Sequence, residues 1–183
     1  MNLAEFLDWE RDQPLRHEFY RGEVYAMVGA TRGHSRVVAN LARHIGNHLE
    51  DGPCQVFSES MKLRVADEGV VYPDVLVSCD ERYGADDLFL TAPVLVIEVL
   101  SPGTEAFDRG RKFALYRKLP SLREYVLIDP QGRSAEVFRA QADGSWSLVA
   151  GPVDARLTLE SIGLELTMAQ VFKGIDGSVG AAA

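Results

Sequence analysis

The sequence predicts a mixed α/β (α+β) fold in which a mixed β-sheet is flanked by helices, and three patterns predict it. Residues 31–50 repeat apolar side chains at i, i+4 and i+7, the spacing of one helix face. Apolar, β-branched runs of strand length occupy residues 70–79, 93–100 and 124–130. A second amphipathic helix at residues 107–119 falls between two of these strands, an order typical of helices packed against a sheet.

Shorter elements are predicted on both sides of this core. Asn2 and Glu5 have capping-box spacing and open a helix over residues 2–12. Alternating residues predict a hairpin over 16–27 and one further strand over 56–65. The C-terminal part predicts, in chain order, a hairpin of strands 134–140 and 145–150, a helical turn within 167–175 and a frayed tail over 176–183.

Length and composition predict one folded domain over residues 1–183. No apolar run approaches the roughly 20 residues that span a bilayer, and the acidic, amphipathic N-terminus is unlike a signal peptide. Cys54 and Cys79 do not suggest a disulfide framework, which favours a reducing, cytoplasmic setting. The net charge of −8 argues against loose, non-specific adhesion to nucleic acid or to an anionic membrane.

One carboxylate stands where a buried strand should avoid it. Glu98 lies inside the apolar run 93–100, and burying it without a partner would cost several kcal/mol. Asp74 opens the preceding strand, so the two acids converge if these strands are neighbours. Two carboxylates in a partly apolar site repel each other unless a cation intervenes, and Mg²⁺ prefers oxygen ligands.

Lys112 is the third residue of this predicted site. On the helix over 107–119 it lies on one stripe with Asp108, Leu115, Tyr116 and Leu119, and this is the face expected to pack on the sheet. A lysine there can extend along apolar surface to a polar pocket, where its ammonium could orient a water or stabilise charge on a phosphate.

Each of these residues also has a structural interpretation. Asp74 could end a turn, Glu98 and Lys112 could form a buried ion pair, and Lys112 alone could cover a core edge. Glu18 could be an exposed strand carboxylate, and His34 a histidine at the edge of the core. The combination of two acids and a lysine on two strands and a helix favours a site. The sequence contains no GxSxG, Walker or GxGxxG motif.

These residues carry a resemblance to a known family. The segments "YPDVLVS" and "PVLVIEVLSPGTEAFDRGRKFALYRKLPSLREYVLIDP" resemble the Uma2-type (DUF820) restriction endonucleases of the PD-(D/E)xK nuclease superfamily. The early segment "RHEFYRGEVYAMVGATRGHSRVVANLARHI" resembles the same family, and the likeness covers about residues 15–175. It implies a restriction-endonuclease-like core with N- and C-terminal β-hairpin additions.

The resemblance also implies roles for individual residues. Asp74 and Glu98 match the metal-binding acids, and the carbonyl of Val99 matches an additional ligand. The superfamily places its lysine two residues after the second acid, but this chain has Leu100 there. Lys112 instead matches the Uma2 pattern, in which the next helix supplies the lysine. Glu18 and His34 match recurring positions at the same pocket. Contacts with the substrate backbone are expected from Lys62, Arg64, Arg109 and Arg111.

The expected function is therefore Mg²⁺-dependent hydrolysis of phosphodiester bonds in DNA, with Mn²⁺ as a substitute metal. We expect a homodimer by analogy with nucleases that cut two strands with paired subunits. Two alternatives stay open: a catalytically inactive nuclease-fold module that binds nucleic acid or regulates, and a metal-free structural protein with a buried Glu98–Lys112 pair. Metal titration separates the last from the other two.

Overall fold

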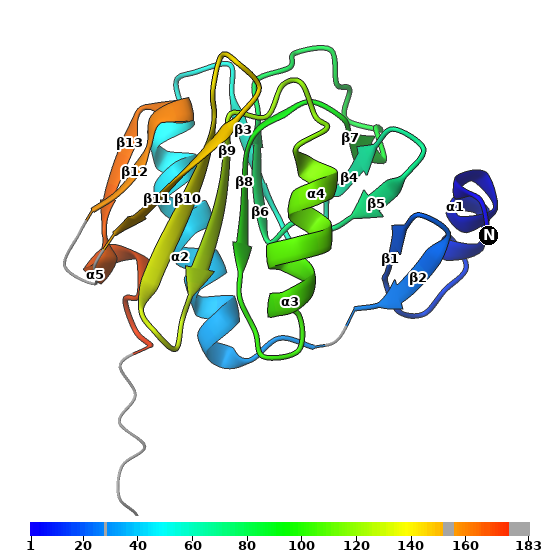
Figure 1. Ribbon diagram of the computed structural model, residues 1–183, viewed down its shortest axis with the longest axis horizontal. Helices are drawn as coiled ribbons and strands as arrows, with labels where there is room; N and C mark the ends of the chain where they lie inside the picture. Colours follow the sequence, from blue (N-terminus) through cyan, green and yellow to red (C-terminus); the bar gives the residue numbers. More distant parts are fainter. Residues whose placement is uncertain (28, 152–155, 176–183) are drawn as a thin grey trace, which may run out of the picture.

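A six-stranded mixed sheet forms the centre of the protein in the computed structural model, which describes residues 1–27, 29–151 and 156–175 (Figure 1). Its strand order is β11-β10-β9-β8-β6-β3. Strands β8 and β9 run parallel, and the other neighbours are antiparallel. The bounds are β3 (Gln55–Ser58), β6 (Val75–Ser78), β8 (Pro93–Val99), β9 (Glu124–Asp129), β10 (Ser134–Ala140) and β11 (Trp146–Gly151). The predicted mixed sheet is confirmed.

Helices cover both faces of this sheet (Figure 1). Helix α2 (Arg32–Leu49) packs Leu41 and Ile45 against the face that carries Val75 and Ile97. The opposite face is covered by α3 (Glu105–Phe107), the π-helical turn η1 (Asp108–Lys112) and α4 (Phe113–Tyr116). Since side chains alternate along a strand, Glu98 points to the second of these faces, the one covered by α3, η1 and α4.

A second, five-stranded sheet lies beside the first, with the order β2-β1-β5-β4-β7. Its strands are β1 (His17–Tyr20), β2 (Glu23–Ala26), β4 (Lys62–Val65), β5 (Gly69–Val71) and β7 (Phe89–Leu90). The predicted N-terminal helix is α1 (Leu3–Glu10), and both hydrogen bonds of its Asn2–Glu5 capping box are present. A Cβ atom at Gly69 would collide with the Leu115 side chain, so glycine allows α4 to approach β5 closely.

Two predicted strands are each divided between the sheets. The prediction of continuous strands over 56–65 and 70–79 is wrong, because β3 and β6 belong to the main sheet while β4 and β5 belong to the second. The first break falls at Glu59, whose φ of 54° lies in the left-handed region. The second falls at Pro73, which has no N–H for a strand ladder. Asp74 therefore lies where the chain passes from one sheet to the other.

The C-terminal elements complete the face covered by α2. Strands β12 (Arg156–Leu159) and β13 (Leu164–Thr167) pair around the 3-10 turn η2 (Glu160–Ile162), and α5 (Met168–Val171) follows. The buried Asn40 side chain of α2 donates to the Val171 carbonyl at 2.9 Å. The predicted hairpin β10–β11 is confirmed and extends the main sheet. The predicted tail over 176–183 lies outside the described residues.

The expectation that the two cysteines stay unpaired is wrong in this structure. Cys54 and Cys79 form a disulfide, because β3 and β6 pair with Gln55 opposite Ser78 and so place the two neighbouring residues face to face. Sequence spacing could not show this juxtaposition, since it depends on strand pairing. Among the described residues, none of the helices has the length and apolar character needed to cross a membrane.

Candidate active site

Glu98 borders a cavity of about 650 Å³ at one end of the two sheets. The cavity lies where the β2–α2 connection meets the turn between β8 and α3, at the lower end of the view in Figure 1. Its lining includes the titratable side chains of Glu18, His34, Asp74, Glu98, Asp108 and Lys112. These side chains come from both sheets and from the helices on either face of the main sheet.

Asp74 and Glu98 lie together because their strands are neighbours. Val75 of β6 pairs with Ile97 of β8, which places the preceding Asp74 opposite Glu98. The Asp74 N–H lies 3.4 Å from Glu98 Oε2, and the Val99 N–H donates to Asp74 Oδ2 at 2.7 Å. The predicted convergence of the two acids is thus present in the structure, and Glu98 is only 2% exposed.

Lys112 lies among three carboxylates. Its Nζ is 3.0 Å from Glu18 Oε1, 3.2 Å from Glu98 Oε1 and 3.3 Å from Asp108 Oδ1. Glu18 also accepts the backbone N–H of Tyr72 at 3.0 Å, which fixes its carboxylate at the floor of the cavity. The buried ion pair that the sequence left open is therefore present, but it is part of a larger and more acidic cluster.

The π-helical turn η1 presents the lysine to this cluster. Asp108 and Lys112, its first and last residues, are both buried, whereas Gly110 between them is exposed. One turn further on, the Tyr116 hydroxyl donates to Glu98 Oε1 at 2.6 Å. Single π-helical turns inside helices are frequently found at functional sites. The π-helical turn and the helical turn after it place Asp108, Lys112 and Tyr116 on the helix face that packs toward β8.

The balance of charge in this cluster shifts several pKa values. Burial raises the pKa of Glu98 well above its ordinary value, and the negative charges of Asp108, Asp74 and Glu18 raise it further against the opposing effect of Lys112. Burial would lower the pKa of Lys112, but the surrounding carboxylates outweigh burial and raise it well above the ordinary value. The lysine stays charged, and the acids exceed the positive charge available to them.

His34 holds Asp74 from the other side. Its Nε2 lies 3.2 Å from Asp74 Oδ2, and it belongs to the first turn of α2, whose N-cap Thr31 also lines the cavity. Burial lowers the pKa of His34, but the hydrogen bond and charge of Asp74 outweigh burial and raise it above the ordinary value. The imidazole Nδ1 is buried and has no hydrogen-bond partner among the described residues.

The donor chemistry of the cluster fits a hard divalent cation. In the described part of the chain, no three His, Cys, Asp or Glu side chains form a ready-made ligand set. Mg²⁺ does not require one, because proteins commonly hold it with one or two carboxylates, while water and substrate phosphate fill the other positions. Asp74 and Glu98, with the backbone carbonyl of Val99, would hold such an ion.

The four cations predicted to contact substrate do not line the cavity. Arg109 pairs with Glu105 and, through both Nη atoms, with Glu136 at 2.8 Å. The Lys62 ammonium lies 6.0 Å from the ring centre of Tyr72, which lines the cavity. Arg111 lies beside the cavity, since it bonds to the lining residue Tyr25.

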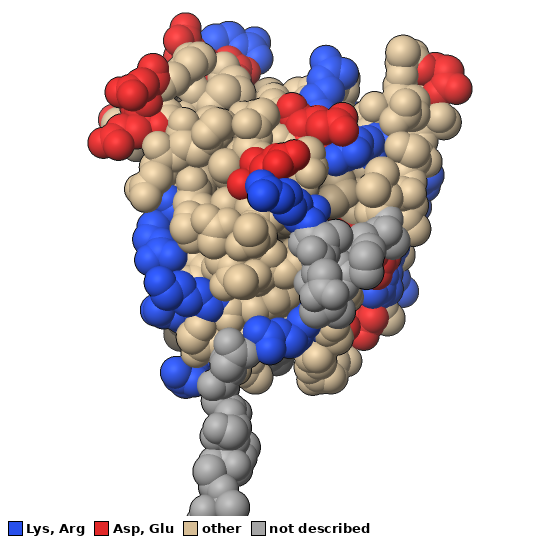
Figure 2. Space-filling model, turned by 90° about the vertical axis from the view of Figure 1, so that its left-hand side faces the viewer, with Lys and Arg blue, Asp and Glu red and all other residues tan. Residues whose placement is uncertain are grey.

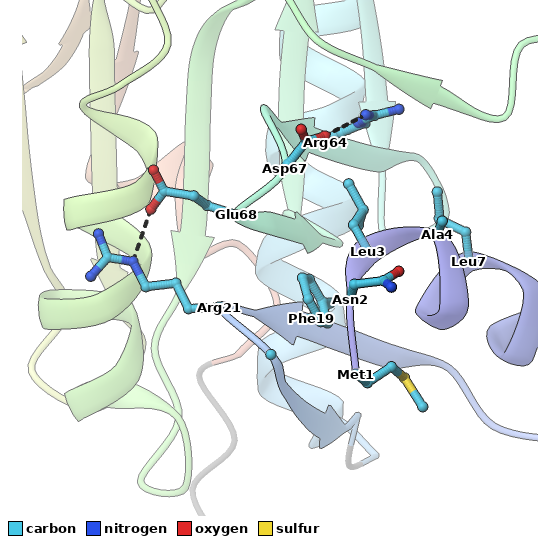
Figure 3. A pocket seen from close by; sticks show the side chains of 11 residues that line it. Met1, Asn2, Leu3, Ala4, Leu7, Phe19, Arg21, Arg64, Asp67 and Glu68 are labelled. Atoms are coloured by element: carbon cyan, nitrogen blue, oxygen red, sulfur yellow. Dashed lines mark hydrogen bonds and ion pairs between the residues drawn. The ribbon is translucent and has the colours of Figure 1, made fainter.

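Arg64, the fourth of these cations, lies at a second pocket instead. This pocket, between α1, β1 and the β4–β5 turn, has a volume of about 760 Å³ (Figure 3). Its two arginines are already paired with acids, Arg64 with Asp67 and Arg21 with Glu68, each at 2.8 Å. A site for an anion would need positive charge that is not already paired with an acid. This pocket is therefore not a second candidate site for a substrate phosphate.

Sequence reasoning missed three residues of the cavity cluster. Asp108 and Tyr116 were placed on the inward helix face, but nothing in the pattern distinguished their contacts with Lys112 and Glu98. Arg16 lines the cavity, donates to the Glu59 carbonyl at 2.8 Å and stacks its guanidinium 5.6 Å from the centre of the Tyr72 ring. The only sequence signal for Arg16 was its place at the start of the predicted N-terminal hairpin.

The face that carries α5, β12 and β13 differs from the cavity. Figure 2 shows Lys and Arg side chains along its left edge, acidic side chains at its upper corners, and neighbouring acidic and basic side chains near its centre, with an uncharged area below these. The buried titratable side chains that could hold a metal ion gather at the cavity instead.

A mixed sheet with helices on both faces, and a buried acid–acid–lysine cluster at one end, defines a protein of nuclease-like fold. The chain belongs to the Uma2 family, described as "Putative restriction endonuclease", which it matches over residues 3–169. The family resemblance drawn from the sequence is confirmed.

Relatives and a solved structure agree with this membership. The chain is 37% identical to the uncharacterized protein slr1290 of Synechocystis sp. over 96% of this chain and 93% of that protein. It is 34% identical to the uncharacterized protein sll1609 of the same organism, over 81% of this chain and 85% of the relative. Its fold is similar to that of "a putative nuclease belonging to DUF820" from Anabaena variabilis ATCC 29413. That match has a TM-score of 0.78 and 22% identity, covers 94% and 97% of the two chains, and bears on the fold alone.

Proposed function

We propose that this protein is a Mg²⁺-dependent endonuclease that hydrolyses phosphodiester bonds of DNA in the cavity around Glu98. The observation that carries the proposal is the buried cluster itself, in which Lys112 pairs with three carboxylates and a fourth, that of Asp74, lies beside Glu98. An anionic phosphodiester would not enter such an acidic site without a cation, and a bound divalent ion reverses the local charge. Membership of a family named for restriction endonucleases supports the same chemistry.

The chain's own residues have separate tasks in this proposal. Asp74, Glu98 and the Val99 carbonyl hold the ion, which when bound lowers the pKa of a coordinated water and neutralises phosphate charge. Lys112 places its ammonium at the floor of the cavity, where it orients the attacking water or offsets charge that develops on the phosphate. His34 and the Val99 N–H fix the Asp74 carboxylate, and Tyr116 fixes that of Glu98.

The direct test is incubation of supercoiled plasmid with the protein in Mg²⁺, Mn²⁺ or EDTA. We expect nicking with either metal and none in EDTA, and we expect Asp74→Asn to abolish it while the variant remains folded. Metal-independent nicking, or nicking that survives in Asp74→Asn, would rule out this site. Binding of DNA without cleavage under any condition would support the inactive, nuclease-fold module instead. A homodimer and a cytoplasmic location remain predictions, testable by light scattering and by cell fractionation.

A further inference from the structure

An aromatic wall stands beside the acidic cluster. Tyr25 of β2 and Phe107 of α3 both line the cavity, and their ring centres lie 4.9 Å apart. Tyr20 supports Phe107 from behind, with its ring centre at 5.9 Å in an edge-on arrangement. All three rings are half-buried, and those of Tyr25 and Phe107 present surface to the cavity. The wall is therefore held by packing and still open to a ligand.

The wall is adjacent to the predicted reaction centre. Lys112 Nζ lies 5.9 Å from the centre of the Phe107 ring, so one small ligand can touch both the ring and the carboxylate cluster. The residues of the cluster are deep, since Lys112 is 6% exposed and Glu98 is 2% exposed. A scissile phosphate that reaches the cluster must therefore pass the residues that line the cavity, which include Arg16 and Tyr72 as well as the wall.

Two cations lie beside the rings of this cavity. Arg16 lines it, and its guanidinium lies 5.6 Å from the centre of the Tyr72 ring and bonds to a backbone carbonyl. The Arg111 guanidinium lies 5.7 Å from the ring centre of Tyr20 and 5.9 Å from that of Tyr25, but it also pairs with Glu23 at 2.8 Å, so Arg16 is the stronger candidate for a backbone contact. Aromatic side chains for base stacking, combined with cations for the backbone, are the features by which proteins bind single-stranded nucleic acid without reading sequence.

We propose that the cavity binds an unpaired nucleotide of DNA, with its base stacked against Tyr25 and Phe107 and its phosphate directed to the cluster around Glu98. This inference rests on the proposed function, and it names the substrate as single-stranded or locally unpaired DNA. A base in an intact duplex is stacked between its neighbours and cannot reach the wall without being unpaired first. The enzyme therefore discriminates by strand state.

The test measures binding apart from cleavage. A fluorescent 12-nucleotide DNA, single-stranded or annealed to its complement, is titrated with the protein in EDTA and in Ca²⁺ at fixed salt, and anisotropy gives Kd. In Ca²⁺, which supplies the divalent charge that the acidic site needs, we expect single-stranded DNA to bind at least about tenfold more tightly than duplex, and Phe107→Leu to weaken the single-stranded complex about tenfold, the usual scale for one stacked base. In EDTA we expect weaker binding of both DNAs. The matched control is Phe89→Leu, because the Phe89 ring also lies beside a cation, Arg64 at 5.5 Å, but does not line the cavity.

The outcomes separate this inference from the proposed function. Equal affinity for both DNAs, no binding to either, or equal effects of the Phe107 and Phe89 variants would overturn the inference, whether or not plasmid is nicked. Tight single-stranded binding that depends on Phe107 supports it even if no metal produces cleavage, and in that case the nuclease proposal alone fails. Thermal melting of both variants confirms that each is folded at the assay temperature.

Discussion

Two buried glutamates on neighbouring strands have opposite surroundings. Glu98 of β8 and Glu124 of β9 are 2% and 1% exposed. Glu124 is matched by donors: Arg139 Nε at 2.8 Å, the Glu160 N–H at 3.1 Å and the Ser161 N–H at 2.8 Å. Arg139 also bonds to the Thr158 carbonyl at 2.8 Å, so this pair ties β12 and η2 to the main sheet. Its geometry is that of a structural ion pair.

Glu98 has donors too, but it shares them with other acids. Lys112 is divided among Glu98, Glu18 and Asp108, and Asp74 lies on the open side of the cluster. A buried carboxylate that serves the fold has its charge and lone pairs satisfied, as at Glu124. The acids around Glu98 share one lysine, an arrangement that supports the proposed cation site. The comparison therefore sets a structural ion pair beside a proposed binding site.

Cleavage should show the largest difference between the two glutamates. We expect Glu98→Gln to lower metal-dependent nicking by at least about a hundredfold, because a metal ion supplies several kcal/mol of charge stabilisation and each ~1.4 kcal/mol is a factor of ten. Glu124→Gln should retain activity within about threefold at a temperature where it is folded. Initial nicking rates of the purified variants measure this, and equal losses in both would remove the distinction.

Stability should show the reverse order. Glu124→Gln removes the buried charge partner of Arg139, which is only 17% exposed and would be left with its ion pair to the exposed Glu160, so we expect a loss of about 3 kcal/mol in the free energy of unfolding. Glu98→Gln removes one of several crowded acids while Lys112 keeps Glu18 and Asp108, and we expect a change within about 1 kcal/mol. Urea denaturation in EDTA measures both values. A larger loss for Glu98→Gln would mean that the cluster is structural.

The smallest effect is expected at Tyr116. Tyr116→Phe removes one hydrogen bond to Glu98 and leaves the packing of the ring in place, so we expect a loss of about 1 kcal/mol in stability. Because Glu98 would be positioned less firmly, nicking should fall by a few-fold with the apparent metal affinity reduced. A metal dependence identical to that of the wild type would show that the tyrosine only stabilises the fold.

Local patterns predicted which way the principal candidate residues face. Strand alternation brings Asp74 to Glu98 only if their strands are neighbours, and the structure shows that β6 and β8 pair; the helical period turns Lys112 inward. The contacts of Asp108 and Tyr116 could not be predicted, because they depend on the exact turn of η1 against β8. Arg16 could not be predicted either, since it reaches the cavity only through the pairing of the second sheet.

The fold was predicted in class but not in its division into two sheets. The segments over 56–65 and 70–79 have uninterrupted strand patterns. The strands nevertheless break at Glu59, where the backbone is left-handed, and at Pro73. The Cys54–Cys79 disulfide depends on the same β3–β6 pairing. Pairing partners far apart in sequence are not encoded in local periodicity, so these features required the structure.

The central claim is that the acids around Glu98 bind a divalent cation, and direct titration of metal-free protein with Mn²⁺, followed by the loss of the free-ion electron paramagnetic resonance signal, tests it best. We predict saturable binding by the wild type, at least tenfold weaker binding by Glu98→Gln, and wild-type binding by Glu124→Gln. Failure of the wild type to bind Mn²⁺, or equal binding by both glutamine variants, would contradict the claim.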